Sequence, residues 1–173
     1  AVRPMNSLFA DELGASMLEI GINTSCYSLT PLFLAVFVGR FIDRFGERLP
    51  LIIGSVGMFI ALTIPYFYPN IYSLYTSQMI LGGSQFLAFV ATQNGIAGSV
   101  SFEKRDKAIA AFSLFGSIGQ MIGPLIGGYS TEHLGFQNSY LAYSLFCIIA
   151  LIVGLFVTPT VDRKKHAKDE KAK

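Results

Sequence analysis

The chain has 173 residues, of which 52% are hydrophobic and 14% are charged, and its formal net charge is +2. A soluble globular domain usually carries about 25% charged residues, so this composition excludes an ordinary soluble protein. The mean hydropathy of +0.52 predicts a membrane protein with several spans, because about 20 apolar residues cross the hydrocarbon core. The apolar runs are continuous and do not alternate with polar residues, which favours an all-α multi-span helical bundle over a β-barrel.

Five apolar segments are long enough to cross a bilayer. The first is the most polar and contains Pro31, which predicts a bend. The connections that we expect are a hairpin within 39–48, a turn at 69–70, and loops at 101–107 and 129–138. The predicted spans lie at about 20–38, 50–68, 71–97, 108–128 and 139–157.

The basic residues predict the orientation of the chain. Twelve of the 13 Lys and Arg residues lie in the segments 40–48, 104–107 and 163–173. With five spans these segments share one side of the membrane, whereas Arg3 lies on the other. Because positive charge is retained in the cytoplasm, we expect a plasma-membrane protein with the N-terminus outside and a cytoplasmic basic tail at 161–173.

The N-terminal segment has no signal peptide, since charged residues interrupt its first 15 positions. An external segment without such a signal predicts a preceding span. We therefore expect residues 1–10 to be the outer end of a first transmembrane helix that begins before Ala1, which would give six helices.

Several site classes are not indicated. Cys26 and Cys147 each fall within an apolar run, and His133 and His166 lie in different loops. This spacing predicts no disulfide and no metal site. No cofactor is indicated, and no paired carboxylates or nucleophile–base set suggests an enzyme. The basic residues lie beside spans, so we expect no nucleic-acid partner.

Two motifs stand out. The first, residues 39–48, reads G-R-F-I-D-R-F-G-E-R and predicts a tight water-facing hairpin between two spans. Gly39 would let another helix approach closely, Gly46 would allow positive φ, and Asp43 would cap a helix or pair with an arginine. The alternative is that Arg44 and Arg48 only anchor the span ends.

The second motif, residues 119–128, reads G-Q-M-I-G-P-L-I-G-G. Its glycines recur every four residues and form a bare stripe, which allows close helix packing in lipid. Pro124 frees a carbonyl group and permits a local bend. The alternative is plain helix packing without a transport role. The defined positions are Gly119, Gly123, Pro124, Gly127 and Gly128.

The first motif resembles the signature loop between helices 2 and 3 of the major facilitator superfamily. Its Gly39, Asp43, Arg44, Gly46 and Arg48 match that pattern, whereas Glu47 stands where a basic residue is usual. The second motif is similar to the helix 5 motif of antiporters in this superfamily, especially multidrug exporters. It matches at every defined position.

The resemblance implies that residues 1–160 form a partial N-terminal six-helix bundle, containing helices 2–6, and that 161–173 begin a cytoplasmic linker. The expected partners are the lipid bilayer, the missing helix 1 and a second six-helix half. Gln78 stands where helix 4 of the family often carries an arginine linked to proton coupling. Any coupling group is therefore expected in the missing helix or half.

Uncharged polar residues among aromatics predict a cavity for apolar or weakly polar solutes. They recur on single helix faces, one or two turns apart. Hydrogen bonding between helices without a ligand is an equal alternative. The candidates are Asn23, Tyr27, Gln85, Phe89, Gln93, Ser113, Ser117 and Gln120.

These features predict a secondary active transporter that exports a small, amphipathic solute. Two bundles would rock around a site near the bilayer midplane. The alternative is a non-transporting membrane remnant, or a partner subunit that assembles with another chain.

Overall fold

The computed structural model describes residues 2–156, which form helices joined by short connections and contain no strand. Three of the helices, α2, α3 and α5, are long and apolar enough to cross a membrane. The predicted all-α membrane bundle is confirmed. The helices are α1 (Val2–Glu12), α2 (Met17–Phe45), α3 (Arg48–Phe67), α4 (Ile71–Ser99) and α5 (Phe102–Phe156). The predicted tail at 161–173 lies outside the described residues.

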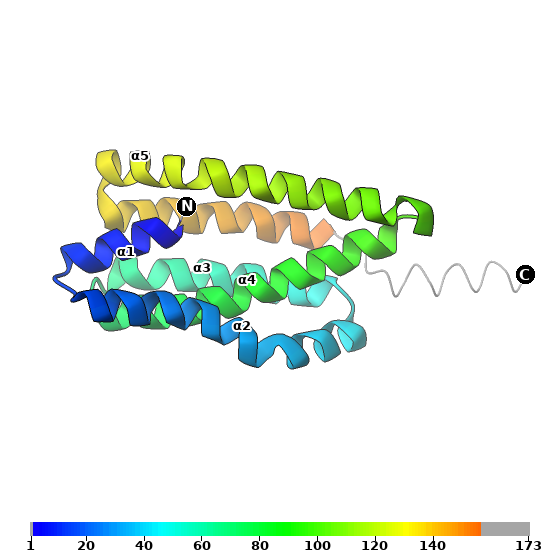
Figure 1. Ribbon diagram of the computed structural model, residues 1–173, viewed down its shortest axis with the longest axis horizontal. Helices are drawn as coiled ribbons and strands as arrows, with labels where there is room; N and C mark the ends of the chain where they lie inside the picture. Colours follow the sequence, from blue (N-terminus) through cyan, green and yellow to red (C-terminus); the bar gives the residue numbers. More distant parts are fainter. Residues whose placement is uncertain (1, 157–173) are drawn as a thin grey trace, which may run out of the picture.

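Helix α5 is folded back on itself. Gly135, at φ 77° and ψ 167°, has the one non-helical conformation within it. It separates a first arm, residues 102–134, from a second arm, residues 136–156, and the two arms run side by side in Figure 1. A positive φ of this kind is accessible to glycine at little cost. The single glycine therefore makes the turn between two antiparallel helical arms.

The predicted loop at 129–138 is therefore wrong, because these residues are helical except at Gly135. The predicted loop at 101–107 is also wrong, since α5 already begins at Phe102. Charge marks where a chain reaches water, but charged residues can remain in the terminal turns of a helix. Apolar content alone consequently predicted helices that are shorter than the observed ones.

Most of the predicted hairpin at 39–48 is helical as well. Residues 39–45 form the last turns of α2, and Gly46 and Glu47 alone connect α2 to α3. Gly46 has φ 74°, in agreement with the positive φ expected there. Its N–H donates to the Ile42 carbonyl oxygen at 2.8 Å, which closes the last turn of α2.

Two helix starts are fixed by side-chain caps. Ser16 and Glu19 form a reciprocal capping box at the start of α2, and Asn70 and Ser73 form one at the start of α4. Such caps satisfy backbone N–H groups that have no partner within the helix. Helix α2 then remains helical through Pro31 and changes direction near its middle (Figure 1).

The tightest helix packing involves glycines on α3 and α4. A Cβ atom on Gly82 of α4 would overlap the Tyr27 carbonyl oxygen of α2. A Cβ atom on Gly54 of α3 would lie 2.7 Å from the Ser84 carbonyl oxygen of α4. These two positions therefore require glycine, because the neighbouring backbones occupy the space. Figure 1 shows α3 and α4 between α2 on one edge and the first arm of α5 on the other.

Helix α1 is a well-packed part of the bundle. Phe9 stacks on Phe136 with ring centroids 5.2 Å apart and contacts Tyr140 at 5.8 Å. Met5, Phe9 and Ala10 are all buried. The second arm of α5 thus packs directly against α1, as expected if these residues belong to a helix of the same bundle.

Candidate functional site

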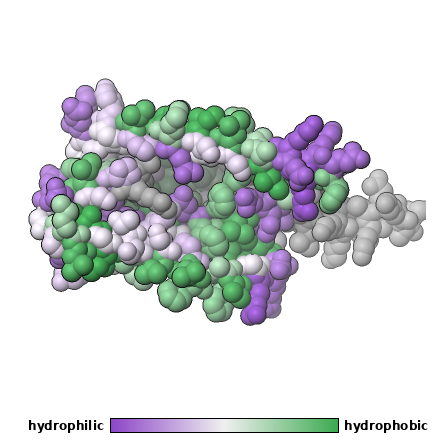
Figure 2. All heavy atoms as spheres, in the orientation of Figure 1, coloured by the Kyte–Doolittle hydropathy of each residue, from purple (hydrophilic) through white to green (hydrophobic). Residues whose placement is uncertain are grey.

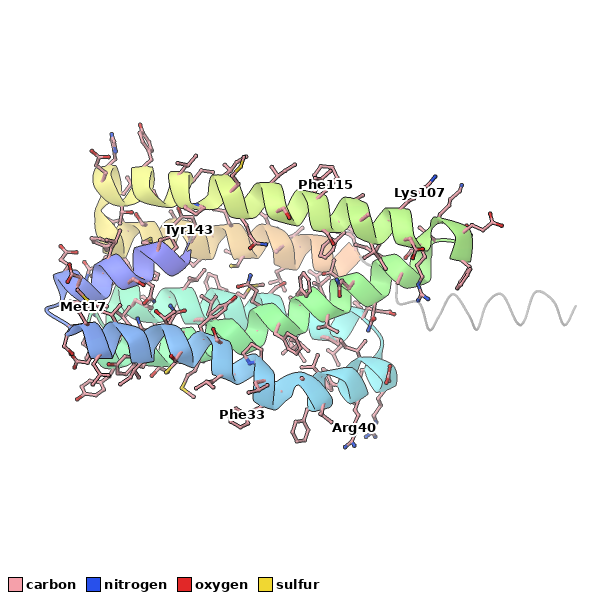
Figure 3. All side chains as sticks on the ribbon, in the orientation of Figure 1. Met17, Phe33, Arg40, Lys107, Phe115 and Tyr143 are labelled. Carbon is pink, nitrogen blue, oxygen red and sulfur yellow. The ribbon has the colours of Figure 1, made fainter. Side chains whose placement is uncertain are left out.

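The two ends of the bundle differ in charge. Arg40, near the end of α2, and Lys107, near the start of α5, lie at the same end of the molecule, whereas Met17 lies at the opposite end (Figure 3). Strongly hydrophilic residues also gather at this end in Figure 2. Two basic segments that are 67 residues apart in the sequence therefore lie at the same end of the bundle (Figure 3), as the sequence predicted for two segments on one side of the membrane.

The residues of the first motif have separate environments. Asp43 is exposed and makes no hydrogen bond or ion pair to another described residue, so it does not cap a helix or pair with an arginine as expected. The N-cap residue of α3 is Glu47, whose side chain makes no capping hydrogen bond. Arg44 lies over the Phe45 ring at 5.3 Å. Arg48 donates through Nη2 to the Leu155 carbonyl oxygen at 2.9 Å. Arg48 thus joins distant helices, since it connects the start of α3 to the second arm of α5.

A Cβ atom on Gly39 would meet nothing within 4 Å. No described helix therefore uses this glycine for close approach.

The glycine stripe of the second motif is only partly packed. Added Cβ atoms on Gly119 and Gly128 would meet nothing within 4 Å. Gly127 is buried, and its carbonyl oxygen accepts hydrogen bonds from Ser130 and Thr131. Gly123 is half-buried and Pro124 is exposed within continuous helix. The described residues hence supply no close helix partner for the stripe at Gly119.

Part of the predicted cavity set is brought together between α2, α4 and α5. The Tyr27 hydroxyl donates to Gln85 Oε1 at 2.6 Å, which joins α2 to α4. Phe89 packs against Phe112 with ring centroids 5.6 Å apart, which joins α4 to the first arm of α5. Gln93 is half-buried one turn further along α4. Tyr27, Gln85 and Phe89 therefore lie on surfaces shared between helices.

The polar candidates on α5 are exposed. Ser113, Ser117 and Gln120 are all exposed, and Ser117 Oγ donates to the Ser113 carbonyl oxygen at 3.0 Å. In Figure 2, residues of low or intermediate hydropathy lie between the hydrophobic surfaces at the upper and lower edges of the molecule. Exposed polar side chains midway along a long apolar helix are unusual, since hydrocarbon cannot hydrogen-bond to them.

Asn23 has a different environment from the other candidates. It is 1% exposed, and its amide nitrogen donates to Asn6 Oδ1 on α1. Asn6 is buried as well, and it lies close to the buried hydroxyl of Tyr140 on α5. Asn23 thus joins three helices through an interior polar cluster. Sequence reasoning missed Asn6 and Tyr140 because nothing in their spacing indicated that they would meet.

Gln78 lines a small polar pocket of about 170 Å³ where α1, α2 and α4 meet. It is 3% exposed, and its Oε1 atom has no hydrogen-bond partner among the described residues. Thr24 and Ser28 supply hydroxyl groups to the same pocket. The pocket can therefore accept a hydrogen bond from water or from a small donor group.

The described residues include no group of three or more His, Cys, Asp or Glu side chains that could hold a metal ion. Cys26 and Cys147 are free cysteines, each half-buried on a different helix. The arrangement thus presents neutral hydrogen-bonding groups and aromatic rings.

Comparisons with known proteins agree with this geometry. The family model described as Major Facilitator Superfamily matches residues 1–173. Multidrug resistance protein 1 of Bacillus subtilis is 25% identical over 98% of this chain and 43% of its own length. Multidrug resistance protein MdtG of Proteus mirabilis is 32% identical over 90% of this chain and 40% of its own length.

The Staphylopine export protein of Staphylococcus aureus is 27% identical over 85% of this chain and 35% of its own length. The chain thus spans less than half the length of these relatives. The family expected from the two motifs is confirmed, and relatives named for multidrug resistance agree with the predicted exporter branch. This multi-pass membrane protein belongs to the Major Facilitator Superfamily.

Proposed function

We propose that this chain forms part of the N-terminal bundle of a secondary active transporter that exports small amphipathic solutes. The observation that carries the proposal is the exposure of Gln85, Ser113, Ser117 and Gln120 on long membrane helices. Polar groups facing hydrocarbon are costly, so these side chains are better accommodated by a hydrated cavity. The names of the multidrug relatives support export as the direction of transport.

The cavity of this transporter would lie between α2, α4 and the first arm of α5. Tyr27 and Gln85 would provide hydrogen bonds, and Phe89 would provide an aromatic wall. Ligand sites commonly combine a mainly apolar lining with a few polar groups that orient the ligand. This composition suits an amphipathic solute better than a strongly charged one.

A second bundle would close the cavity from the opposite side. The exposed first arm of α5, with its bare Gly119 position, is the surface where close helix packing could occur. Alternating access would then move the two bundles around the solute. Residues 1–10 would supply the outer end of helix 1, and residues 161–173 would begin the linker between the bundles.

The orientation that we propose places the end with Arg40 and Lys107 in the cytoplasm and the N-terminus outside the plasma membrane. The support is the shared position of both basic segments at one end of the bundle (Figure 3). A cysteine-accessibility experiment tests this orientation. Single cysteines replacing Ser16 and Ser101 should react from the outside and from the cytoplasm, respectively, with a reagent that cannot cross the membrane.

Transport is tested in the complete open reading frame that contains these residues. Efflux of a panel of amphipathic fluorescent dyes would be measured in bacteria that lack their own exporters. We expect Gln85→Leu and Gln120→Leu each to lower efflux by up to about tenfold, since one lost hydrogen bond is worth about 0.5–1.5 kcal/mol. The control is Phe33→Leu on α2, whose side chain is 72% exposed and points away from the bundle (Figure 3). Unchanged efflux in both glutamine variants would contradict the proposed cavity.

The alternative, a remnant or a subunit that binds another chain, is favoured by one observation, the large unpacked surface on the first arm of α5. The reading frame distinguishes the two. Six further spans downstream would support the transporter, whereas stop codons at both ends together with co-purification of a second membrane chain would support the subunit.

A further inference from the structure

An open groove of about 720 Å³ runs between α2 and α4, separate from the polar face described above. Its walls are mainly apolar. The α2 side includes Leu34, Phe37 and Phe41, and the α4 side includes Met79 and Leu87. The proposed solute cavity uses none of these five residues, so the groove calls for its own explanation.

Two arginines line one end of this groove. Arg40 and Arg44 are one helical turn apart on α2, and no acidic residue is among the groove's lining. Neither guanidinium makes a hydrogen bond or an ion pair with another described residue, and the Arg44 guanidinium lies over the Phe45 ring. The groove therefore combines an apolar channel with a concentrated positive charge at one end.

The position of the groove matches one leaflet of a bilayer. Helix α2 carries large exposed apolar side chains beside it, including Phe33 at 72% and Phe37 at 66% exposure, which is expected where a helix faces hydrocarbon. From Thr30 to Arg44 the helix rises by about 21 Å, at about 1.5 Å per residue. Half of the hydrocarbon core is about 15 Å thick, so the groove extends from near the midplane into the headgroup region.

From these features we infer that the groove binds an anionic phospholipid. One acyl chain lies along the apolar walls, and the phosphate accepts hydrogen bonds from the Arg40 and Arg44 guanidinium groups. Guanidinium groups bind phosphate oxygens strongly because the hydrogen bonds are charge-assisted. A soluble anion would leave the apolar walls uncovered, and a zwitterionic lipid would neutralise less of the arginine charge.

Tryptophan fluorescence tests this site directly, because the chain contains no tryptophan. Phe37→Trp places a reporter in the groove. Phe33→Trp places a control one turn earlier on the same helix, at a similarly exposed position that points away from the bundle (Figure 3). Each variant of the full chain would be reconstituted in phosphatidylcholine vesicles that contain brominated phosphatidylglycerol or brominated phosphatidylcholine.

The measured quantity is the ratio of quenching by the two brominated lipids at the same position, because this ratio cancels differences in depth. We expect a ratio of several-fold at position 37 and a ratio near one at position 33. Since each basic residue near the surface attracts anionic lipid about fivefold, Arg40→Gln and Arg44→Gln should each lower the ratio at position 37 by about that factor.

The matched control is the pair of substitutions Lys104→Gln and Arg105→Gln, which removes two positive charges near the start of α5 and should leave the ratio unchanged. Raising the salt concentration should lower the ratio at position 37 without any arginine substitution. A ratio near one at position 37 would overturn the proposal. So would strong shielding of this tryptophan from both lipids, because a protein segment would then cover the groove.

Discussion

Two regions of this bundle contain similar glycine-rich helix segments and use them differently. On α4, Gly82 lies against the backbone of α2, so that even one added carbon atom would overlap it. On the first arm of α5, Gly119 belongs to a more regular glycine stripe and yet has open space around it. The comparison teaches that glycine spacing indicates a surface suited to close packing, whereas the presence of a partner helix depends on the rest of the fold.

The largest effect is expected where the packing is tightest. Gly82→Ala should lower the free energy of unfolding by about 1–3 kcal/mol or more, because α2 and α4 must separate to admit the methyl group. Gly116→Ala on α5 is the matched control, since its added Cβ atom meets nothing within 4 Å. That control should raise stability by up to about 1 kcal/mol through helix propensity. Denaturant unfolding in detergent micelles, followed by circular dichroism, measures both, and equal effects would contradict the comparison.

The interior polar cluster should give the next largest effect. Asn23→Ala removes the donor to Asn6 and leaves a buried oxygen without a partner, at a cost of about 1–3 kcal/mol. Asn94→Ala on α4 changes an exposed asparagine and should alter stability little. Unfolding midpoints of the two variants provide the measurement. A smaller loss for Asn23→Ala than for Asn94→Ala would show that the Asn6 contact is not stabilising.

The contact between the start of α3 and the second arm of α5 should matter less. Arg48→Gln removes the hydrogen bond to the Leu155 carbonyl oxygen and should lower stability by about 0.5–1.5 kcal/mol. Arg40→Gln removes the same charge from a residue that makes no hydrogen bond within the described chain, and it serves as the control. The same unfolding assay compares them, and indistinguishable midpoints would mean that the Arg48 contact contributes nothing.

The smallest effect on this chain is expected at the bare stripe. Gly119→Leu should change the free energy of unfolding by less than about 0.5 kcal/mol, apart from a gain in helix propensity, because nothing opposes the new side chain. In the complete reading frame the same substitution should strongly reduce dye efflux, if a second bundle packs there. Full efflux with Gly119→Leu would show that this surface is not an interface between bundles.

The helical nature of the chain and its family follow from sequence features that act locally. Long uncharged runs require helices in lipid, and the spacing of Gly39, Asp43, Arg44, Gly46 and Arg48 depends only on their order along the chain. The positive φ of Gly46 was predictable for the same reason. Helix ends were not predictable, because the terminal turns of α2 and α5 accommodate charge, and a single conformation at Gly135 replaces a loop of ten residues.

Tertiary structure decided which polar and glycine residues have partners. The hydrogen bond between Tyr27 and Gln85 joins residues that are 58 positions apart, and Asn6 meets Asn23 through the docking of α1. The Gly82 contact exists because α2 crosses α4 at that position, and the open groove lies where the same two helices diverge (Figure 1). The sequence alone determined a helical membrane bundle of a known family, since periodicity and hydropathy act within one helix. Only packing determined its contacts, because they depend on how separate helices cross in space.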